Sequence, residues 1–198
     1  MSLIAKLITR FLSTNFAIKL IYGVNCRKNT LPFQAGFATL QMKRAFDKYV
    51  KDNDKILDLG IGPLAVLSIW LKKNKNVDVT GSDLFEKHIN VAREVIKDNK
   101  VDIKLIKSDL FDNITGKFDI IAFNPPFNNP RDKKTYSLMD RFLKQAPNSK
   151  IFLVVNPNYV DIKRIITMIK KSNYEIHSVV ESFFNKAKVF IIKRKIKG

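Results

Sequence analysis

The sequence predicts an α/β protein with a doubly wound, mainly parallel sheet of seven strands, an antiparallel last strand and N-terminal helices. Two observations support this class. From Lys55 onward, short apolar strands alternate with amphipathic helical segments, and glycines or prolines often separate them. The chain then ends in two strand-like segments with no helix between them, so these two strands are expected to pair antiparallel at one end of the sheet.

The first fifty residues are predicted to be mostly helical. Apolar residues recur every three or four positions, which places Ile4, Leu7 and Phe11 on one stripe. A Ser-Thr-Asn run offers a cap for a second helix, and the segment that contains Pro32 and Gly36 is expected to be a loop. The three expected helices span residues 3–12, 16–21 and 37–50.

The remaining elements follow from the alternation of apolar runs and turn residues. Pro63 is placed in the first turn of its helix, where a missing N–H costs nothing. Strands are expected at residues 55–59, 77–82, 103–107, 118–123, 151–155, 174–182 and 188–195, and helices at 63–73, 84–98, 135–145 and 159–171. We therefore divide the chain into an N-terminal helical extension, residues 1–50, and an α/β domain, residues 51–198.

Composition restricts the class of protein. The chain has 198 residues, of which 45% are apolar, and this excludes a disordered chain. Apolar stretches such as residues 151–155 are far shorter than the ~20 residues that cross a bilayer, so no integral membrane insertion is expected. Lys6 and Arg10 interrupt the N-terminal apolar stretch and argue against a signal peptide. The single cysteine, Cys26, suits a reducing compartment, and we expect a cytoplasmic protein.

The net charge is +18, from 36 basic and 18 acidic residues, and it is concentrated at the two ends. Residues 1–50 and 151–198 carry +7 each, whereas residues 51–100 carry +1 and residues 101–150 carry +3. A general bias toward lysine would raise the basic count but would not deplete acids at both ends. The pattern predicts a polyanionic partner, with nucleic acid first and an anionic membrane surface second.

A glycine turn follows the first expected strand. Asp58 and Leu59 lead into Gly60, Ile61 and Gly62, and such glycines let the backbone approach a bound group closely. Asp83 lies at the end of the next strand, where a carboxylate can accept hydrogen bonds from both hydroxyls of a ribose. These residues together predict a site for an adenosine-containing cofactor.

Two cofactors compete for this site. The run from Gly60 to Ala65 formally matches the G-x-G-x-x-[GA] fingerprint of dinucleotide binding, so NAD has to be considered. Asp58 is poorly suited to a neighbouring pyrophosphate but can meet a cationic methionine end. The turn therefore favours S-adenosylmethionine, with NAD, or a glycine turn without a ligand, as the alternatives.

A second candidate site follows the fourth expected strand, at Asn124, Pro125, Pro126 and Phe127. Consecutive prolines cannot continue the ladder, so the strand stops here and leaves carbonyl acceptors. Two fixed acceptors can hold an –NH₂ group and favour the tetrahedral geometry that its nitrogen needs to attack a methyl group. Phe127 offers a flat face for stacking. The alternative is a proline-rich turn with a buried Phe.

The combination resembles the class I S-adenosylmethionine-dependent methyltransferases with an Asn-Pro-Pro-[Phe/Tyr] motif. These include release-factor glutamine methyltransferases, adenine-amino DNA and RNA methyltransferases, and ribosomal RNA guanine-amino methyltransferases. The resemblance covers residues 55–195 and implies a Rossmann-like methyltransferase domain at residues 51–198. One departure is Leu64, where many relatives have a third glycine.

The resemblance implies a role for each motif residue. Asp58, Gly60 and Gly62 would border the methionine part of S-adenosylmethionine, while Asp83, followed by Leu84, would hold the ribose. Asp109 would accept from the adenine amino group and Leu110 would donate a backbone N–H. Catalysis would rest on three residues that hold the target nitrogen, with the asparagine also next to the cofactor: Asn124, Pro125 and Phe127.

We therefore expect an N-methyltransferase that acts on an exocyclic amino group of a base in RNA, with ribosomal RNA first, or less favourably in DNA. The alternatives are a glutamine amide of a translation factor and a non-catalytic nucleic-acid-binding module. Phe33 and Gln34 could close over the cofactor, and Arg131, Lys133 and Lys134 could grip phosphates. No metal is expected, because His88 and His177 lack metal-ligand spacing and are interpreted as structural.

Overall fold

The computed structural model describes residues 3–26, 36–126, 132–182 and 185–195. Seven helices and seven strands lie within these ranges. The helices are α1 (Leu3–Leu12), α2 (Asn15–Tyr22), α3 (Phe37–Tyr49), α4 (Val66–Asn74), α5 (Glu86–Asp98), α6 (Lys133–Gln145) and α7 (Ile162–Lys171). The strands are β1 (Lys55–Leu59), β2 (Asp78–Asp83), β3 (Lys104–Lys107), β4 (Ile120–Phe123), β5 (Lys150–Val155), β6 (Tyr174–Ser182) and β7 (Asn185–Arg194).

The strands form one sheet in the order β3-β2-β1-β4-β5-β7-β6. The pairs from β3 through β5 are parallel, and β7 pairs antiparallel with both β5 and β6. Because the chain returns from β3 to the other side of β1, the strand order reverses between β1 and β4. In a sheet of this kind, ligands bind at the carboxyl ends of the strands beside such a reversal.

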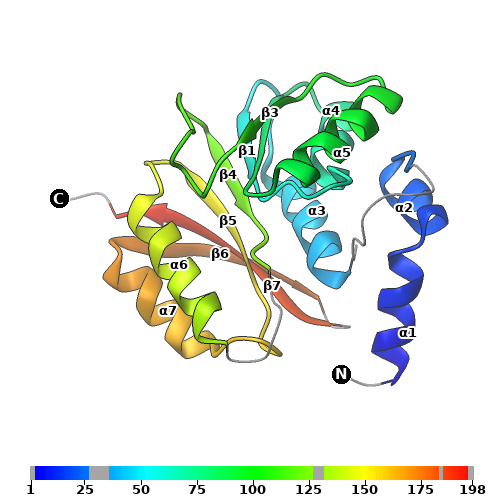
Figure 1. Cartoon of the computed structure of the whole chain (residues 1–198). Coiled ribbons are helices and arrows are strands. Elements are labelled where there is room, and N and C mark those ends of the chain that lie inside the picture. The colour runs from blue at the N-terminus through cyan, green and yellow to red at the C-terminus, as the bar shows by residue number, and fades with distance from the viewer. Residues whose placement is uncertain (1–2, 27–35, 127–131, 183–184, 196–198) are drawn as a thin grey trace.

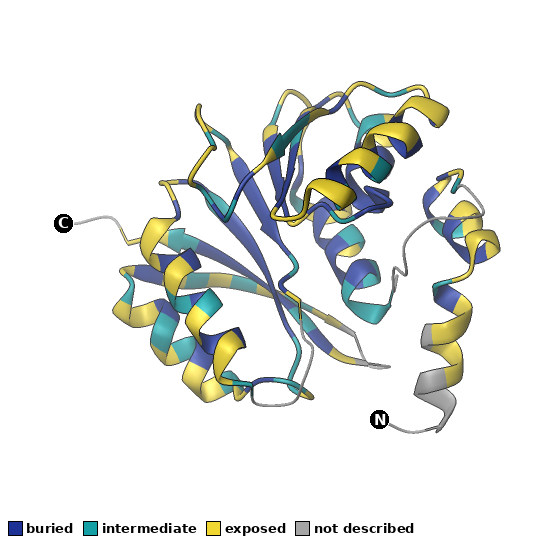
Figure 2. Cartoon of the chain, in the orientation of Figure 1, coloured by how far each residue is buried: buried dark blue, intermediate teal, exposed yellow. Residues whose placement is uncertain are grey.

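Helices cover both faces of the sheet (Figure 1). The core on one face includes residues of α2, α3, α4 and α5, and the core on the other face includes residues of α6 and α7. Two central strands, β4 and β5, are buried almost throughout (Figure 2) and consist mainly of Ile, Val, Leu and Phe. Burial on both faces removes the alternation of polar and apolar residues, as parallel strands require.

The predicted fold class is confirmed, but several helix starts were wrong by two or three residues. The fourth helix begins at Val66 rather than Pro63, because Ala65 has a left-handed backbone (φ 47°) that cannot continue a helix. The last helix begins at Ile162 rather than Tyr159, where the side chain of Asp161 caps the N–H groups of Lys163 and Arg164.

The N-terminal helices lie along one flank of the molecule (Figure 1). Ile18 and Tyr22 of α2 are buried in the core that α3 and α4 share, whereas Leu7 and Phe11 of α1 are exposed. Among the helices that the structure describes, none is both long enough and apolar enough to cross a bilayer.

Candidate functional site

The candidate residues meet at the carboxyl edge of the central strands. Parallel pairing sets Leu59 beside both Ser82 and Phe123, so the next residues, Gly60 and Asn124, leave the sheet side by side. On the other side of β1, Asp83 ends β2. The register therefore brings the glycine turn, Asp83 (the candidate residue for binding the ribose) and Asn124 together at one edge of the sheet, as the sequence predicts.

The glycine turn is tied to β2 by its backbone. Gly60 and Gly62 have φ values of 76° and 68°, in the left-handed region that glycine adopts without strain. The N–H groups of Gly60 and Ile61 both donate to the carbonyl oxygen of Ser82 at 2.8 Å. A Cβ atom on Gly60 would have no atom within 4 Å, so open space lies over this exposed residue.

A neighbouring glycine in β2 has a different function. A Cβ atom on Gly81 would lie 2.1 Å from Cδ1 of Ile61, whose side chain is buried. The missing side chain of Gly81 therefore makes room for Ile61, which anchors the turn between the two flexible glycines. Sequence reasoning missed this pair, because a single glycine inside a strand does not say which side chain covers it.

Asp83 is buried and has a preset orientation. One carboxylate oxygen, Oδ2, accepts from the N–H of Gly62 at 3.1 Å, and Oδ1 accepts from the N–H of Phe85 at 3.0 Å. Nδ1 of His88 lies 3.0 Å from the same Oδ1. These bonds hold the carboxylate at the strand tip, beside the exposed side chains of Leu84 and Phe85.

His88 contributes to the site more than the sequence suggested. The sequence analysis interprets His88 as structural. In the structure it lies in the first turn of α5 and contacts Asp83, the candidate residue for binding the ribose. Its ring also packs edge-on against Phe85, with 5.1 Å between the ring centroids. The sequence signals this contact only through the spacing: His88 follows Asp83 by five residues, which places it on the helix that follows the strand.

Asp58 is a buried carboxylate with one direct partner among the described residues. Its Oδ2 accepts from Oγ of Ser68 at 2.6 Å, and 6% of the residue is exposed. The pKa of the Asp58 carboxyl is raised to about 6, chiefly by burial; the hydrogen bond from the Ser68 hydroxyl opposes this shift, and the negative charge of Asp83 adds to it. A cation next to Asp58 would offset the cost of its buried charge.

Asp109 lies two residues beyond the end of β3 and is half-exposed. Its carboxylate forms an ion pair with Arg141 of α6, with 2.9 Å between Nη2 and Oδ2. The next residue, Leu110, is buried and has a left-handed backbone (φ 46°). Strained backbone of this kind is concentrated at functional sites, and here it turns the chain immediately after the candidate adenine ligand.

Asn124 and Pro125 directly follow β4, and Pro125 is buried. The end of β4 is held against α6, because the ring of Phe123 stacks on the ring of Phe142 with 4.5 Å between the ring centroids. Phe127, our third candidate for holding the target nitrogen, lies outside the described residues, as do Arg131 and the pair Phe33 and Gln34. Lys133 and Lys134 begin α6 and are exposed.

Comparison with known proteins now adds to this geometry. The model of one protein family, described as the methyltransferase small domain, matches residues 37–197. The chain belongs to the methyltransferase small domain family. This membership confirms the resemblance, the enzyme class and the use of S-adenosylmethionine that the sequence predicts, and it removes NAD as the alternative.

Two curated relatives of this methyltransferase illustrate the range of the family. This chain is 33% identical to the release factor glutamine methyltransferase of Lactococcus lactis over 102 residues. The aligned region covers 52% of this chain and 37% of the relative. The chain is 34% identical over 96 residues to ribosomal RNA small subunit methyltransferase C of Haemophilus influenzae, with 48% and 29% covered. The chain thus spans less than two thirds of the curated relatives that it matches.

A solved structure agrees over nearly the whole chain. A methyltransferase from Pyrococcus furiosus superposes with a TM-score of 0.75 at 19% identity and covers 96% of this chain and 98% of its own. At this identity the likeness concerns the fold alone.

The residues present fit S-adenosylmethionine. The buried carboxylate of Asp58 suits a cationic methionine end, and the open space over Gly60 leaves room for it. Asp83 has a fixed carboxylate for hydroxyl groups, and the exposed apolar side chains of Leu84 and Phe85 offer a surface for a base. Each assignment of a residue to a part of the cofactor stays a proposal.

Replacement of the carboxylate at the end of β2 tests the ribose assignment. We expect Asp83→Ala to weaken S-adenosylmethionine binding by about 100-fold or more, because two hydrogen bonds to a charged acceptor are lost, each worth ~1.5 kcal/mol or more. Isothermal titration calorimetry measures the affinity, and Asp102→Ala, at an exposed position before β3, is the matched control. Unchanged affinity in Asp83→Ala would show that the ribose lies elsewhere.

Proposed function

We propose that this methyltransferase transfers the methyl group of S-adenosylmethionine to an exocyclic amino group of a base in RNA. The single observation that carries this proposal is the register that sets Asn124 beside Gly60 at the carboxyl edge. An acceptor nitrogen held by Asn124 would lie next to the place where Asp58 and the glycine turn receive the methionine end. Donor and acceptor would then meet without further movement of the sheet.

The chain's own residues position the reaction rather than perform acid–base chemistry. When bound, the cofactor supplies an electrophilic methyl group on a cationic sulfur. The side-chain carbonyl of Asn124 and the carbonyl of Pro125 would accept the two hydrogens of an –NH₂ group, which directs the nitrogen lone pair at the methyl carbon. After transfer, the nitrogen carries the positive charge and loses its extra proton to water.

The net charge of +18 supports a nucleic acid as the substrate rather than a protein amide. A base must leave its stack to reach a strand tip, and exposed cations can hold the flanking phosphates meanwhile. Similarity to both rRNA and release-factor methyltransferases leaves a glutamine amide as the second candidate, because it also presents a flat –NH₂ group.

Labelling of total cell extract tests the proposed substrate class. The protein is incubated with tritiated-methyl S-adenosylmethionine and the extract, and the products are treated separately with ribonuclease, deoxyribonuclease and protease. We expect ribonuclease to release the label. Release by protease alone would refute the proposal in favour of the amide, and release by deoxyribonuclease would move the substrate to DNA.

A further inference from the structure

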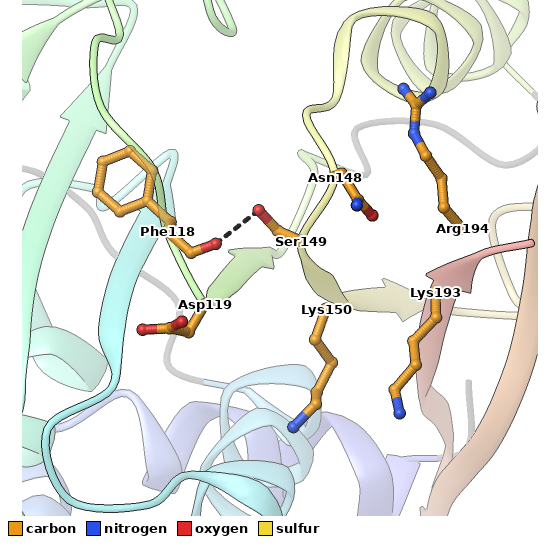
Figure 3. A pocket seen from close by; sticks show the side chains of 7 residues that line it. All are labelled: Phe118, Asp119, Asn148, Ser149, Lys150, Lys193 and Arg194. Carbon is orange, nitrogen blue, oxygen red and sulfur yellow. Dashed lines mark hydrogen bonds between the residues drawn. The ribbon is translucent and has the colours of Figure 1, made fainter. Parts of the chain in front are cut away.

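A cavity of about 310 Å³ opens at the edge of the sheet opposite the cofactor site. It lies where β4 and β5 begin and β7 ends, and basic side chains of Lys150, Lys193 and Arg194 line it together with Asp119 (Figure 3). Neither the cofactor nor the acceptor nitrogen would reach this place. The cavity therefore needs a separate explanation.

Two lysines in this cavity face each other across adjacent strands. The antiparallel register pairs Ile151 with Ile192, so Lys150 and Lys193 lie opposite each other one position further along. Both side chains extend to the same side of the cavity in Figure 3, and neither ammonium group has a hydrogen bond or an ion pair with any described residue. Like charges directly opposite on a sheet are destabilising, so an anion between them would relieve a cost built into the fold.

The neighbouring carboxylates that the structure describes form no ion pair with either lysine. Asp119 accepts from the backbone N–H of Lys55 at 2.8 Å, and its carboxylate extends away from the two lysines in Figure 3. Glu175 pairs with Lys193 in the register of β6 and β7 but is exposed and forms no ion pair with it.

Arg194 adds a fixed positive charge at the rim. Its guanidinium donates to the carbonyl oxygen of Ala146 at 3.0 Å and lies over the ring of Tyr174. These contacts hold the side chain in place yet use only part of its five N–H donors. In Figure 3 the guanidinium extends to the opposite side of the cavity from the two lysine side chains, so the anion would lie between the ammonium groups of Lys150 and Lys193, with Arg194 adding longer-range attraction.

We propose that this cavity binds a phosphate group of the backbone of the RNA substrate. The proposal rests on the proposed function, which it deepens: β5 is six residues long, so about 20 Å separate the cavity from the acceptor edge. An RNA that contacts both edges must be folded and must extend around the end of the sheet. A short acceptor would use only the carboxyl edge and would not need the lysines.

Charge reversal of both lysines tests the site. In Lys150→Glu/Lys193→Glu, the dissociation constant for a fluorescent RNA hairpin should rise about 10-fold or more at low salt. The slope of its logarithm against the logarithm of salt concentration should fall by about 1, as expected for the loss of one phosphate contact. Fluorescence anisotropy measures both quantities. The matched control, Lys97→Glu/Lys104→Glu, changes two exposed lysines on α5 and β3, at the other end of the strand order, and should alter the affinity by less than about 2-fold.

Equal losses in the two double variants would overturn the proposal, because the attraction would then be a diffuse property of the basic surface. Unchanged RNA affinity in Lys150→Glu/Lys193→Glu would also overturn it. Thermal unfolding in inorganic phosphate separates the sources of the ligand: stabilisation of the unmodified protein but not of this variant, with RNA affinity unchanged, would indicate a site for free phosphate instead.

The experiments distinguish a refutation of the phosphate site from a refutation of the proposed RNA methylation. Transfer of labelled methyl groups is measured with the unmodified protein, whereas RNA binding is measured with the variants. RNA binding that depends on the two lysines, together with label found only in protein, would refute the RNA substrate and leave the phosphate site standing. Circular dichroism and cofactor calorimetry confirm that both double variants are folded.

Discussion

Asn124→Ala is expected to reduce methyl transfer by about 10²–10³-fold while S-adenosylmethionine binds with unchanged affinity. The side-chain carbonyl of Asn124 is one of two proposed acceptors that hold the –NH₂ group. Its loss leaves the nitrogen free to stay planar and conjugated with the base, where its lone pair is a poor nucleophile. Asp58 and Asp83 are untouched, so the cofactor keeps its contacts.

Single-turnover transfer of a tritiated methyl group to RNA measures the rate, and calorimetry measures the cofactor affinity. Asn90→Ala, at an exposed position of α5, is the matched control and should retain full activity. A fully active Asn124→Ala would contradict the positioning role. An equal loss of activity and of cofactor binding would show that Asn124 serves the cofactor rather than the acceptor.

The strand tips were predictable from the sequence because each is marked by a change in local chemistry. Asp58, Asp83 and Asn124 lie at or next to the ends of expected strands, and the first and third are followed closely by Gly60 and Pro125. Carboxyl ends of parallel strands meet at one edge, so the order along the chain was enough to place these residues together. The register of β1 with β2 and β4 agrees with that expectation.

The partners of these residues could not be predicted in the same way. Ser68, His88 and Arg141 contact Asp58, Asp83 and Asp109, and each partner lies on a helix. Which helical residue faces a strand tip depends on where the helix begins and how it rotates over the sheet. A shift of one residue turns a side chain by about 100°, and our expected start of α4 was wrong by three residues.

From the sequence, Lys150 and Lys193 could be recognised only as part of a general excess of positive charge. Lys193 belongs to a basic run in residues 151–198, the C-terminal part of the chain whose excess charge predicts a polyanionic partner. Antiparallel insertion of β7 beside β5 brings that run against Lys150, about forty residues earlier in the chain. A pairing across this distance is a property of the sheet topology, which local patterns do not encode.

Asp58→Asn is expected to stabilise the cofactor-free protein at neutral pH and to weaken S-adenosylmethionine binding by about 10-fold or more. The pKa of Asp58 is raised to about 6 from an ordinary value of 3.8, so the folded state retains the proton over a range in which the unfolded chain has lost it. The stability of the unmodified protein therefore falls as the pH rises from about 4 to 6, by roughly 3 kcal/mol for a shift of this size. Asparagine keeps an acceptor for Ser68 without the buried charge.

The pH dependence of cofactor binding has the opposite sign. A cationic methionine end favours the ionised carboxylate, so the affinity of the unmodified protein should decrease as the pH falls through about 6, and Asp58→Asn should lose this dependence. Thermal unfolding and calorimetry from pH 4 to 8 measure both effects, with Asp78→Asn, at the exposed start of β2, as the control. A less stable Asp58→Asn that binds the cofactor normally would contradict both expectations, because the buried charge would then be neither costly to the fold nor used by the ligand. Stability gained together with affinity lost would instead show that the protein maintains an unfavourable buried carboxylate for the cation that it binds.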